Sequence, residues 1–185
     1  MIYNSNDMEL RAVMDTAQAM CAAARTAPKA RGLDRIVTAV LTGEDKDALA
    51  AEMERMGAEM GAEMGADFFI RDGGNLRAAQ AIVLIGIRES KRGLGGICGY
   101  CHFADCAECA RQGGVCVYDP VDVGIAVGSA AAAAADRRVD NRVLFSAGRA
   151  AISLGTLGEG VGQVFGIPLS VSGKSPFFDR KKKTQ

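Results

Sequence analysis

Five of the six cysteines of this chain lie in one short segment, between Cys98 and Cys116. The segment reads CGYCHFADCAECARQGGVC, a C-x2-C-x4-C-x2-C-x6-C spacing, and only Cys21 lies elsewhere. A disulfide framework is typical of small secreted chains. This chain has 185 residues, and its first residues, MIYNSNDMELR, show no basic segment followed by an apolar one, so we expect no export signal. Crowded thiols in such a chain predict soft-metal ligands.

The composition predicts one globular domain. Hydrophobic residues make up 49% and charged residues 24% of the chain, which is long enough to bury a core. The 22 basic residues balance 22 acidic ones, so no net charge would attract nucleic acid or an anionic membrane. No apolar run reaches the roughly 18 residues of a membrane span. We therefore expect a cytoplasmic protein with neither nucleic acid nor membrane as a partner.

Residue patterns outside the cysteine segment predict a mixture of helices and strands without a regular βαβ repeat, hence an α+β (mixed α/β) class. Helices are predicted at about 7–25, 44–63, 75–80, 122–138, 147–154 and 159–165. Strands are predicted at 35–41, 81–87, 116–118, 142–146 and 168–171, with a strand or buried corner at 68–70. The small side chains of the alanine-rich helix at 122–138 would let a second helix or a subunit pack closely, which favours a dimer.

The spacing of the cysteines leaves the ligand set open. Structural zinc sites usually separate two pairs of ligands by a dozen or more residues, whereas dense runs of thiols are typical of iron–sulfur sites. The first candidate set contains Cys101, Cys106 and Cys109, which reproduce the C-x4-C-x2-C part of a plant-type 2Fe–2S site. The second set is Cys98, Cys101, Cys106 and Cys116, with the spacing C-x2-C-x4-C-x9-C, and it resembles the 4Fe–4S segments of small iron–sulfur domains. Zinc is the alternative metal, and His102, the only histidine, is a further candidate ligand.

Several motifs together carry a family resemblance. They are CGYCHFADC from Cys98, then Cys116, DVGIAVGSA from Asp122, VDNR from Val139, GIPLS from Gly166 and GKSPFFDR from Gly173. Over nearly its whole length the chain resembles a prokaryotic family described as containing a ferredoxin domain. In that family the position of His102 is usually glycine, and the position of Cys109 is usually not cysteine. The resemblance therefore implies a 4Fe–4S cluster on Cys98, Cys101, Cys106 and Cys116, with Cys109 as a spare thiol.

A looser resemblance concerns the fold. The segment ARTAPKARG, from Ala24 to Gly32, is similar to the Ala-Pro-Ser loop of FMN-dependent nitroreductases. The resemblance implies one nitroreductase-like domain over 1–185, a central sheet flanked by helices, with 88–118 inserted as a cysteine-rich metal-binding loop. It also implies a homodimer that binds FMN at the subunit interface. The Arg-Arg-Ser-x-Arg segment with which such proteins hold the flavin phosphate is absent, so the candidate replacements are Arg25, Lys29, Arg31 and Lys174.

Two functions follow from these features. The first is an iron–sulfur redox protein that transfers single electrons to or from a redox partner, with FMN available for two-electron reduction of a small substrate. The second is a non-enzymatic module in which zinc or an iron–sulfur cluster is structural and the chain serves as a partner or carrier protein. No pair of carboxylates stands at a spacing typical of acid–base catalysis, so we assign no catalytic residue.

Overall fold

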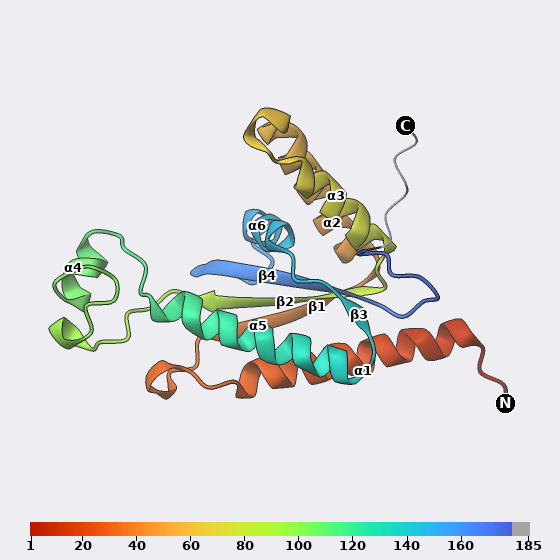
Figure 1. Cartoon of the computed structure of the whole chain (residues 1–185), viewed down its shortest axis with the longest axis horizontal. Coiled ribbons are helices and arrows are strands. Elements are labelled where there is room, and N and C mark those ends of the chain that lie inside the picture. Colours follow the sequence, from red (N-terminus) through yellow and green to blue (C-terminus); the bar gives the residue numbers. More distant parts are fainter. Residues whose placement is uncertain (179–185) are drawn as a thin grey trace.

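The computed structural model describes residues 1–178, and the basic tail at 180–183 lies outside them. A four-stranded antiparallel sheet in the order β1-β2-β4-β3 lies between two layers of helices (Figure 1). Its strands are β1 (Ile36–Leu41), β2 (Ala81–Arg88), β3 (Asp140–Asn141) and β4 (Val161–Ser170). This arrangement confirms the expected α+β class with a central sheet flanked by helices.

Strand β2 is the centre of the fold, as its continuous apolar run predicts. Every side chain from Ala81 to Ile87 is buried, because β1 and β4 pair with its two edges and helices cover both faces. Successive side chains of a strand point to opposite faces. Accordingly Val83 and Ile85 belong to one buried cluster, and Ile82 and Leu84 belong to another. The predicted strands at 35–41 and 81–87 are confirmed.

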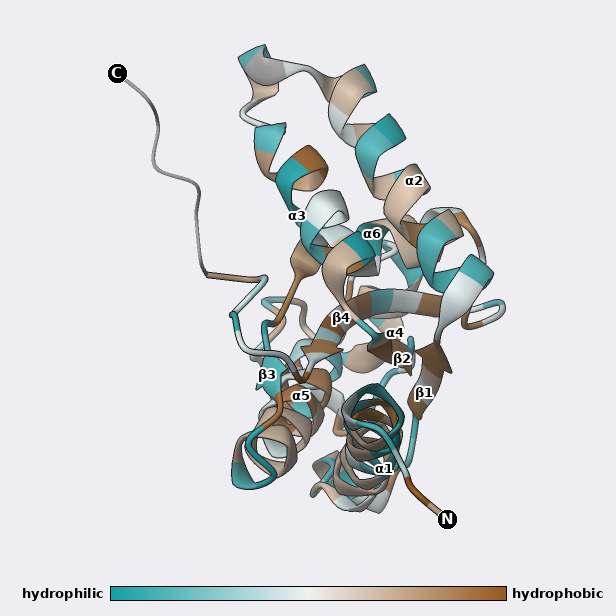
Figure 2. Cartoon of the chain, turned by 90° about the vertical axis from the view of Figure 1, so that its right-hand side faces the viewer, coloured by the Kyte–Doolittle hydropathy of each residue, from teal (hydrophilic) through white to brown (hydrophobic). Residues whose placement is uncertain are grey.

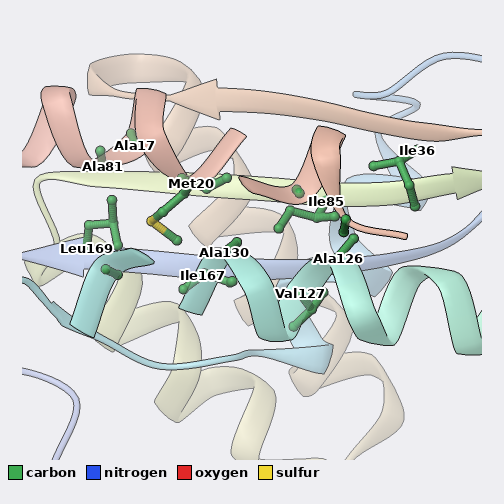
Figure 3. Close-up of a cluster of buried hydrophobic side chains, with 14 of the residues drawn as sticks. Ala17, Met20, Ile36, Ala81, Ile85, Ala126, Val127, Ala130, Ile167 and Leu169 are labelled. Carbon is green, nitrogen blue, oxygen red and sulfur yellow. The ribbon is translucent and has the colours of Figure 1, made fainter. Parts of the chain in front are cut away.

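The first helical layer pairs α1 (Ser5–Thr26) with α5 (Tyr118–Asp136). Met20 of α1, Ala126 and Ala130 of α5 and Ile85 of β2 belong to one buried cluster, in which Met20 faces the part of α5 that carries Ala130 (Figure 3). The small side chains of α5 let the two helices pack closely on the sheet. One face of this helix, with Ala126, Ala130 and Ala134, is thus buried within the chain.

The second layer contains α2 (Gly43–Met60), followed by the short η2 (Ala62–Met64), α3 (Asp67–Ala78) and α6 (Phe145–Ser153). Figure 2 shows it on the opposite side of the sheet from α1 and α5. Helix α6 lies so close to β4 that a Cβ atom on Gly148 would stand 1.7 Å from the carbonyl oxygen of Val164. Only glycine allows the two backbones to approach in this way.

Three predicted strands and one predicted helix are wrong. Residues 68–70 form no strand but belong to α3, because Phe69 and Leu76 stand seven residues apart on one buried helical face. Residues 116–118 form no strand, and α5 already begins at Tyr118. The predicted strand at 142–146 is only a bridge from Leu144 to Gly166, after which the buried alanines of α6 favour a helix.

The predicted helix at 159–165 is instead the first half of β4. Gly158 and Gly160 have φ angles of +83° and +74°, so they form a left-handed turn that a helix would not contain. The chain leaves this turn extended, and β4 pairs along the whole of β2. The predicted strand at 168–171 is therefore the second half of a longer one.

Candidate metal centre

The cysteine-rich loop, residues 88–118, extends from one end of the sheet between the end of β2 and the start of α5 (Figure 1). It contains two short helices, η3 (Gly95–Ile97) and α4 (Cys106–Arg111). Gly99 and His102 both have left-handed φ angles, +65° and +64°, and the His102 N–H donates to the carbonyl of Gly99 over 3.1 Å. This turn places Cys98 and Cys101 close together. His102 is one of three residues other than glycine among 1–178 that have a left-handed φ, a conformation that disfavours most side chains.

The four cysteines of the second ligand set line one hollow, which is partly open to solvent. Cys98 follows η3, Cys106 opens α4, and Cys116 lies two residues before α5. Among residues 1–178, no three or more His, Cys, Asp or Glu side chains stand at the spacing of a ready-made ion site. The case for a metal therefore depends on the donor set itself: four thiols around one hollow suit zinc or iron–sulfur chemistry.

Cys109 and His102 lie outside the residues that line this hollow. The Cys109 thiol is buried behind it, donates to the carbonyl of Val115 over 3.8 Å, and hydrogen-bonds the Cys101 thiol. Burial is the largest cause that raises the pKa of Cys109, and the nearby Lys91 ammonium opposes it. His102 is exposed. Cys109 and His102 are thus both separate from the four cysteines that share the hollow.

Tyr118, the first residue of α5, closes the hollow beside Cys98. The tyrosine and the Cys98 thiol are hydrogen-bonded, and the Tyr118 ring lies 6.4 Å from that of Tyr100. The pKa of Tyr118 is raised first by burial and then by the neighbouring thiols and Tyr100. The phenol thus stays protonated and available as a donor at neutral pH.

Arg92 connects the hollow to the rest of the fold. Its side chain is buried, with an exposed fraction of 1%, and it ion-pairs with Asp119 over 2.9 Å and with Asp122 over 2.7 Å. Asp119 also accepts from the Ser90 N–H, and Asp122 accepts from the Ala30 N–H. The two carboxylates of α5 therefore bind the start of the cysteine-rich loop, at Ser90, and the connection between α1 and β1, at Ala30.

Two further cations hold the loop from outside. The Lys91 ammonium donates to the carbonyl of Gly114, which joins the two ends of the loop. The Arg31 guanidinium donates to the carbonyl of Arg92 over 2.6 Å. In both contacts a side chain donates to a carbonyl group that pairs with no strand. Side-chain donors therefore help to set the path of the loop.

The predicted flavin-phosphate residues do not gather at one place. Arg25 lies in the last turn of α1 and pairs with Asp34 over 2.8 Å, and Lys29 and Arg31 follow between α1 and β1. Lys29 caps the carbonyl of Ala27 over 2.9 Å. Lys174 lies in the last segment, in a shallow pocket with Asp140, toward the end of the sheet away from the cysteine-rich loop (Figure 1). Each of the first three cations already has a partner within the chain.

Sequence reasoning missed Arg92 and its two carboxylates. Arg92 precedes Gly93, Gly95 and Gly96 in a segment whose sequence predicts an irregular loop, and Asp119 falls outside the predicted helix. The available signal was the i, i+3 spacing of Asp119 and Asp122, which places both carboxylates on one face once the helix begins at Tyr118.

The fold and the site define a nitroreductase-like α+β domain that carries a cysteine-rich loop. An FMN-bound nitroreductase from Desulfitobacterium hafniense superposes with a TM-score of 0.60, covering 92% of this chain and 85% of that one at 19% identity. A putative nitroreductase in complex with FMN from Desulfovibrio desulfuricans gives 0.55, covering 91% and 80% at 14% identity. Nitroreductase CinD from Lactococcus lactis, in complex with chloramphenicol, gives 0.55, covering 100% and 85% at 17% identity.

Sequence comparison gives the family. Residues 112–180 match the model of a family described as "Uncharacterized protein containing a ferredoxin domain". A protein from Archaeoglobus fulgidus, itself described as uncharacterized, is 39% identical over 191 residues, which cover 99% of this chain and all of the relative. The chain belongs to this ferredoxin-domain family. The description of the family, a ferredoxin domain, suggests a redox function and an iron–sulfur cluster. Within residues 1–178, no helix combines the length and apolar character needed to cross a membrane.

Proposed function

We propose that the protein is an iron–sulfur redox protein whose cluster is held by Cys98, Cys101, Cys106 and Cys116. The observation that carries the proposal is that these four thiols, brought together from 98–116, line one hollow. Its family, described by a ferredoxin domain, supports the same chemistry. We favour a 4Fe–4S cluster, because the spacing resembles that of small iron–sulfur domains. The bound cluster would store and relay single electrons.

The residues around the hollow have roles that follow from their positions. The four cysteines bind iron as thiolates, and the buried Arg92 guanidinium lies where it opposes their negative charge. Phe103 and Tyr118 line the same hollow and limit access of water. Because thiolate ligands require reduced cysteines, and the cytosol keeps thiols reduced, we place the protein in the cytoplasm.

A flavin is the second part of the proposal. We propose that two copies of the chain bind FMN between them, with Arg25, Lys29, Arg31 and Lys174 as candidates for the phosphate, and that the flavin reduces a small substrate. Two FMN-bound proteins with the same fold support this part. The exposed side of α5 supports a homodimer, because its residues Val121 and Ile125 are 44% and 40% exposed and Gly124 and Gly128 have open space before them.

The test is the cofactor content of protein purified without oxygen. We expect iron and acid-labile sulfide in similar amounts, a broad visible absorbance that dithionite bleaches, and FMN in the supernatant after denaturation. A colourless protein with one zinc per chain would overturn the redox proposal and favour the carrier module. Iron and sulfide without FMN would overturn the flavin part alone, and a monomer by light scattering would overturn the homodimer.

A further inference from the structure

One nitrogen of Arg92 is buried without a partner. The two terminal nitrogens of its guanidinium face Asp119 and Asp122, and Nη1 also donates to the hydroxyl of Ser90 over 2.5 Å. The remaining donor, Nε–H, is buried and has no hydrogen-bond partner among the residues that the structure describes. A buried donor without a partner costs free energy comparable to a lost hydrogen bond, so folded proteins rarely keep one. The position of this nitrogen therefore calls for an acceptor that the protein chain does not itself supply.

The surroundings of Arg92 indicate what that acceptor is. Arg92 lines the same hollow as the four cysteines. The carboxylate of Asp105, which also lines it, already accepts from the Glu108 N–H over 2.7 Å at the start of α4. The other groups around the hollow are glycines, apolar side chains, Tyr118 and thiols. Sulfur is thus the acceptor that the donor set provides.

We infer that Arg92 Nε–H donates a hydrogen bond to a sulfur of the bound iron–sulfur cluster, either an inorganic sulfide or a cysteine thiolate, and thereby raises its reduction potential. The inference rests on the proposed function. Reduction adds one electron to a cluster that four thiolates already make negative, and a hydrogen-bond donor stabilises the added charge. Asp119 and Asp122 hold the guanidinium in one orientation and offset part of its charge. The main effect of Arg92 on the cluster would therefore come from the hydrogen bond that its Nε–H donates, and less from its net charge. Arg92 is a positioning and tuning residue rather than a catalytic one.

The substitution Arg92→Lys tests this role. Lysine keeps a positive charge for the two carboxylates but has no N–H at the position of Nε. In a dithionite titration of the purified holoprotein, we expect the ratio of reduced to oxidised cluster at a fixed potential to fall about tenfold, which corresponds to a decrease of about 59 mV for a one-electron couple. The matched control is Arg111→Lys on the exposed last turn of α4, which makes the same change beside the cluster and should leave the potential unchanged.

A second measurement needs no variant. Wild-type protein grown with arginine labelled at Nε with nitrogen-15 should show a nitrogen-15 coupling to the reduced cluster in pulsed electron paramagnetic resonance. Absence of that coupling overturns the inference even if Arg92→Lys fails to load iron, and so does an unchanged potential in a loaded Arg92→Lys protein. Wild-type protein without iron and sulfide overturns the proposed function instead, so the two failures are distinguishable.

Discussion

Strand β2 and the cysteine-rich loop that follows it are stabilised in different ways. Within β2, the side chains from Ala81 to Ile87 are all apolar or glycine and all buried. Beyond it, between residues 89 and 118, the buried side chains are Arg92, Cys109 and Cys116. The sheet is therefore stabilised by apolar burial, whereas the cysteine-rich loop depends on ion pairs and on side-chain hydrogen bonds to its carbonyl groups. Substitutions should separate the two regions.

The largest effect is expected where helix and sheet touch. Gly148→Ala would place a Cβ atom 1.7 Å from the carbonyl oxygen of Val164, so α6 must leave β4. Overpacking usually costs about 1–3 kcal/mol, and a clash with backbone exceeds that range. We expect little soluble, folded protein by circular dichroism.

The control for this change is Gly74→Ala on the exposed face of α3, where nothing lies within 4 Å of the added atom. Alanine in a helix interior is more favourable than glycine by about 0.5–1 kcal/mol, so this variant should melt at the wild-type temperature or above it. If both variants behave alike, the close approach of α6 to β4 is wrong.

The second effect concerns the junction of the two regions. Asp122→Asn removes one of the two carboxylates that face the buried Arg92, and it leaves the guanidinium short of a counter-charge. Breaking a buried ion pair from one side costs about 3–5 kcal/mol. We expect a lower urea midpoint and faster proteolysis of the cysteine-rich loop, with the sheet retained. Asp136→Asn, at the exposed end of the same helix, is the matched control, and an equal loss in both would show that the Arg92 network contributes nothing.

The difference between apolar burial in the sheet and polar contacts in the loop also decides what the sequence can predict. The strands at 36–41 and 81–88 are predictable because each is a nearly continuous run of apolar residues, many of them β-branched, although β2 is buried from 81 to 87 and β1 is only half-buried beyond Ile36. β4 was missed in its first half, because its pairing with β2 depends on a glycine turn at 158–160 and not on its own pattern. The spacing of the four cysteines predicts them as ligands, and the structure places all four around one hollow. Arg92 could not be predicted, because the sequence gives no measure of burial for a charged residue whose partners, Asp119 and Asp122, come from another element.

The third prediction changes the loop alone. Cys98→Ser, Cys101→Ser, Cys106→Ser or Cys116→Ser removes a thiolate from the shared hollow, and we expect iron to fall below about a tenth of the wild-type content. Far-UV circular dichroism should change little, since no ligand belongs to the sheet. Cys109→Ser is the control, because that thiol packs behind the hollow. Should Cys109→Ser lose as much iron as Cys116→Ser, the choice of fourth ligand is wrong.

The smallest effect lies in the helical layer farthest from the loop and depends on pH. The Glu52 carboxylate of α2 accepts from Arg55 over 2.7 Å and from the Ser153 hydroxyl of α6 over 2.6 Å, and these two bonds, Arg55 first, lower its pKa from 4.5 to about 2. Because the folded value lies below the unfolded one, the contribution to stability is complete above about pH 4.5 and is lost as the pH falls toward 2. Since Arg55 is half-exposed, solvent screening reduces this contribution to about 1 kcal/mol or less.

Glu52→Gln should therefore lower the free energy of unfolding in urea at neutral pH and bring the variant close to wild type in acid. Glu59→Gln is the matched control, because Glu59 pairs with the same Arg55 but is 64% exposed, and it should change stability little at either pH. Iron content at neutral pH should be equal in all three proteins, since α2 and α6 lie on the sheet and contribute nothing to the hollow. A pH-independent difference between Glu52→Gln and wild type would show that the link between α2 and α6 is not carried by this carboxylate's charge.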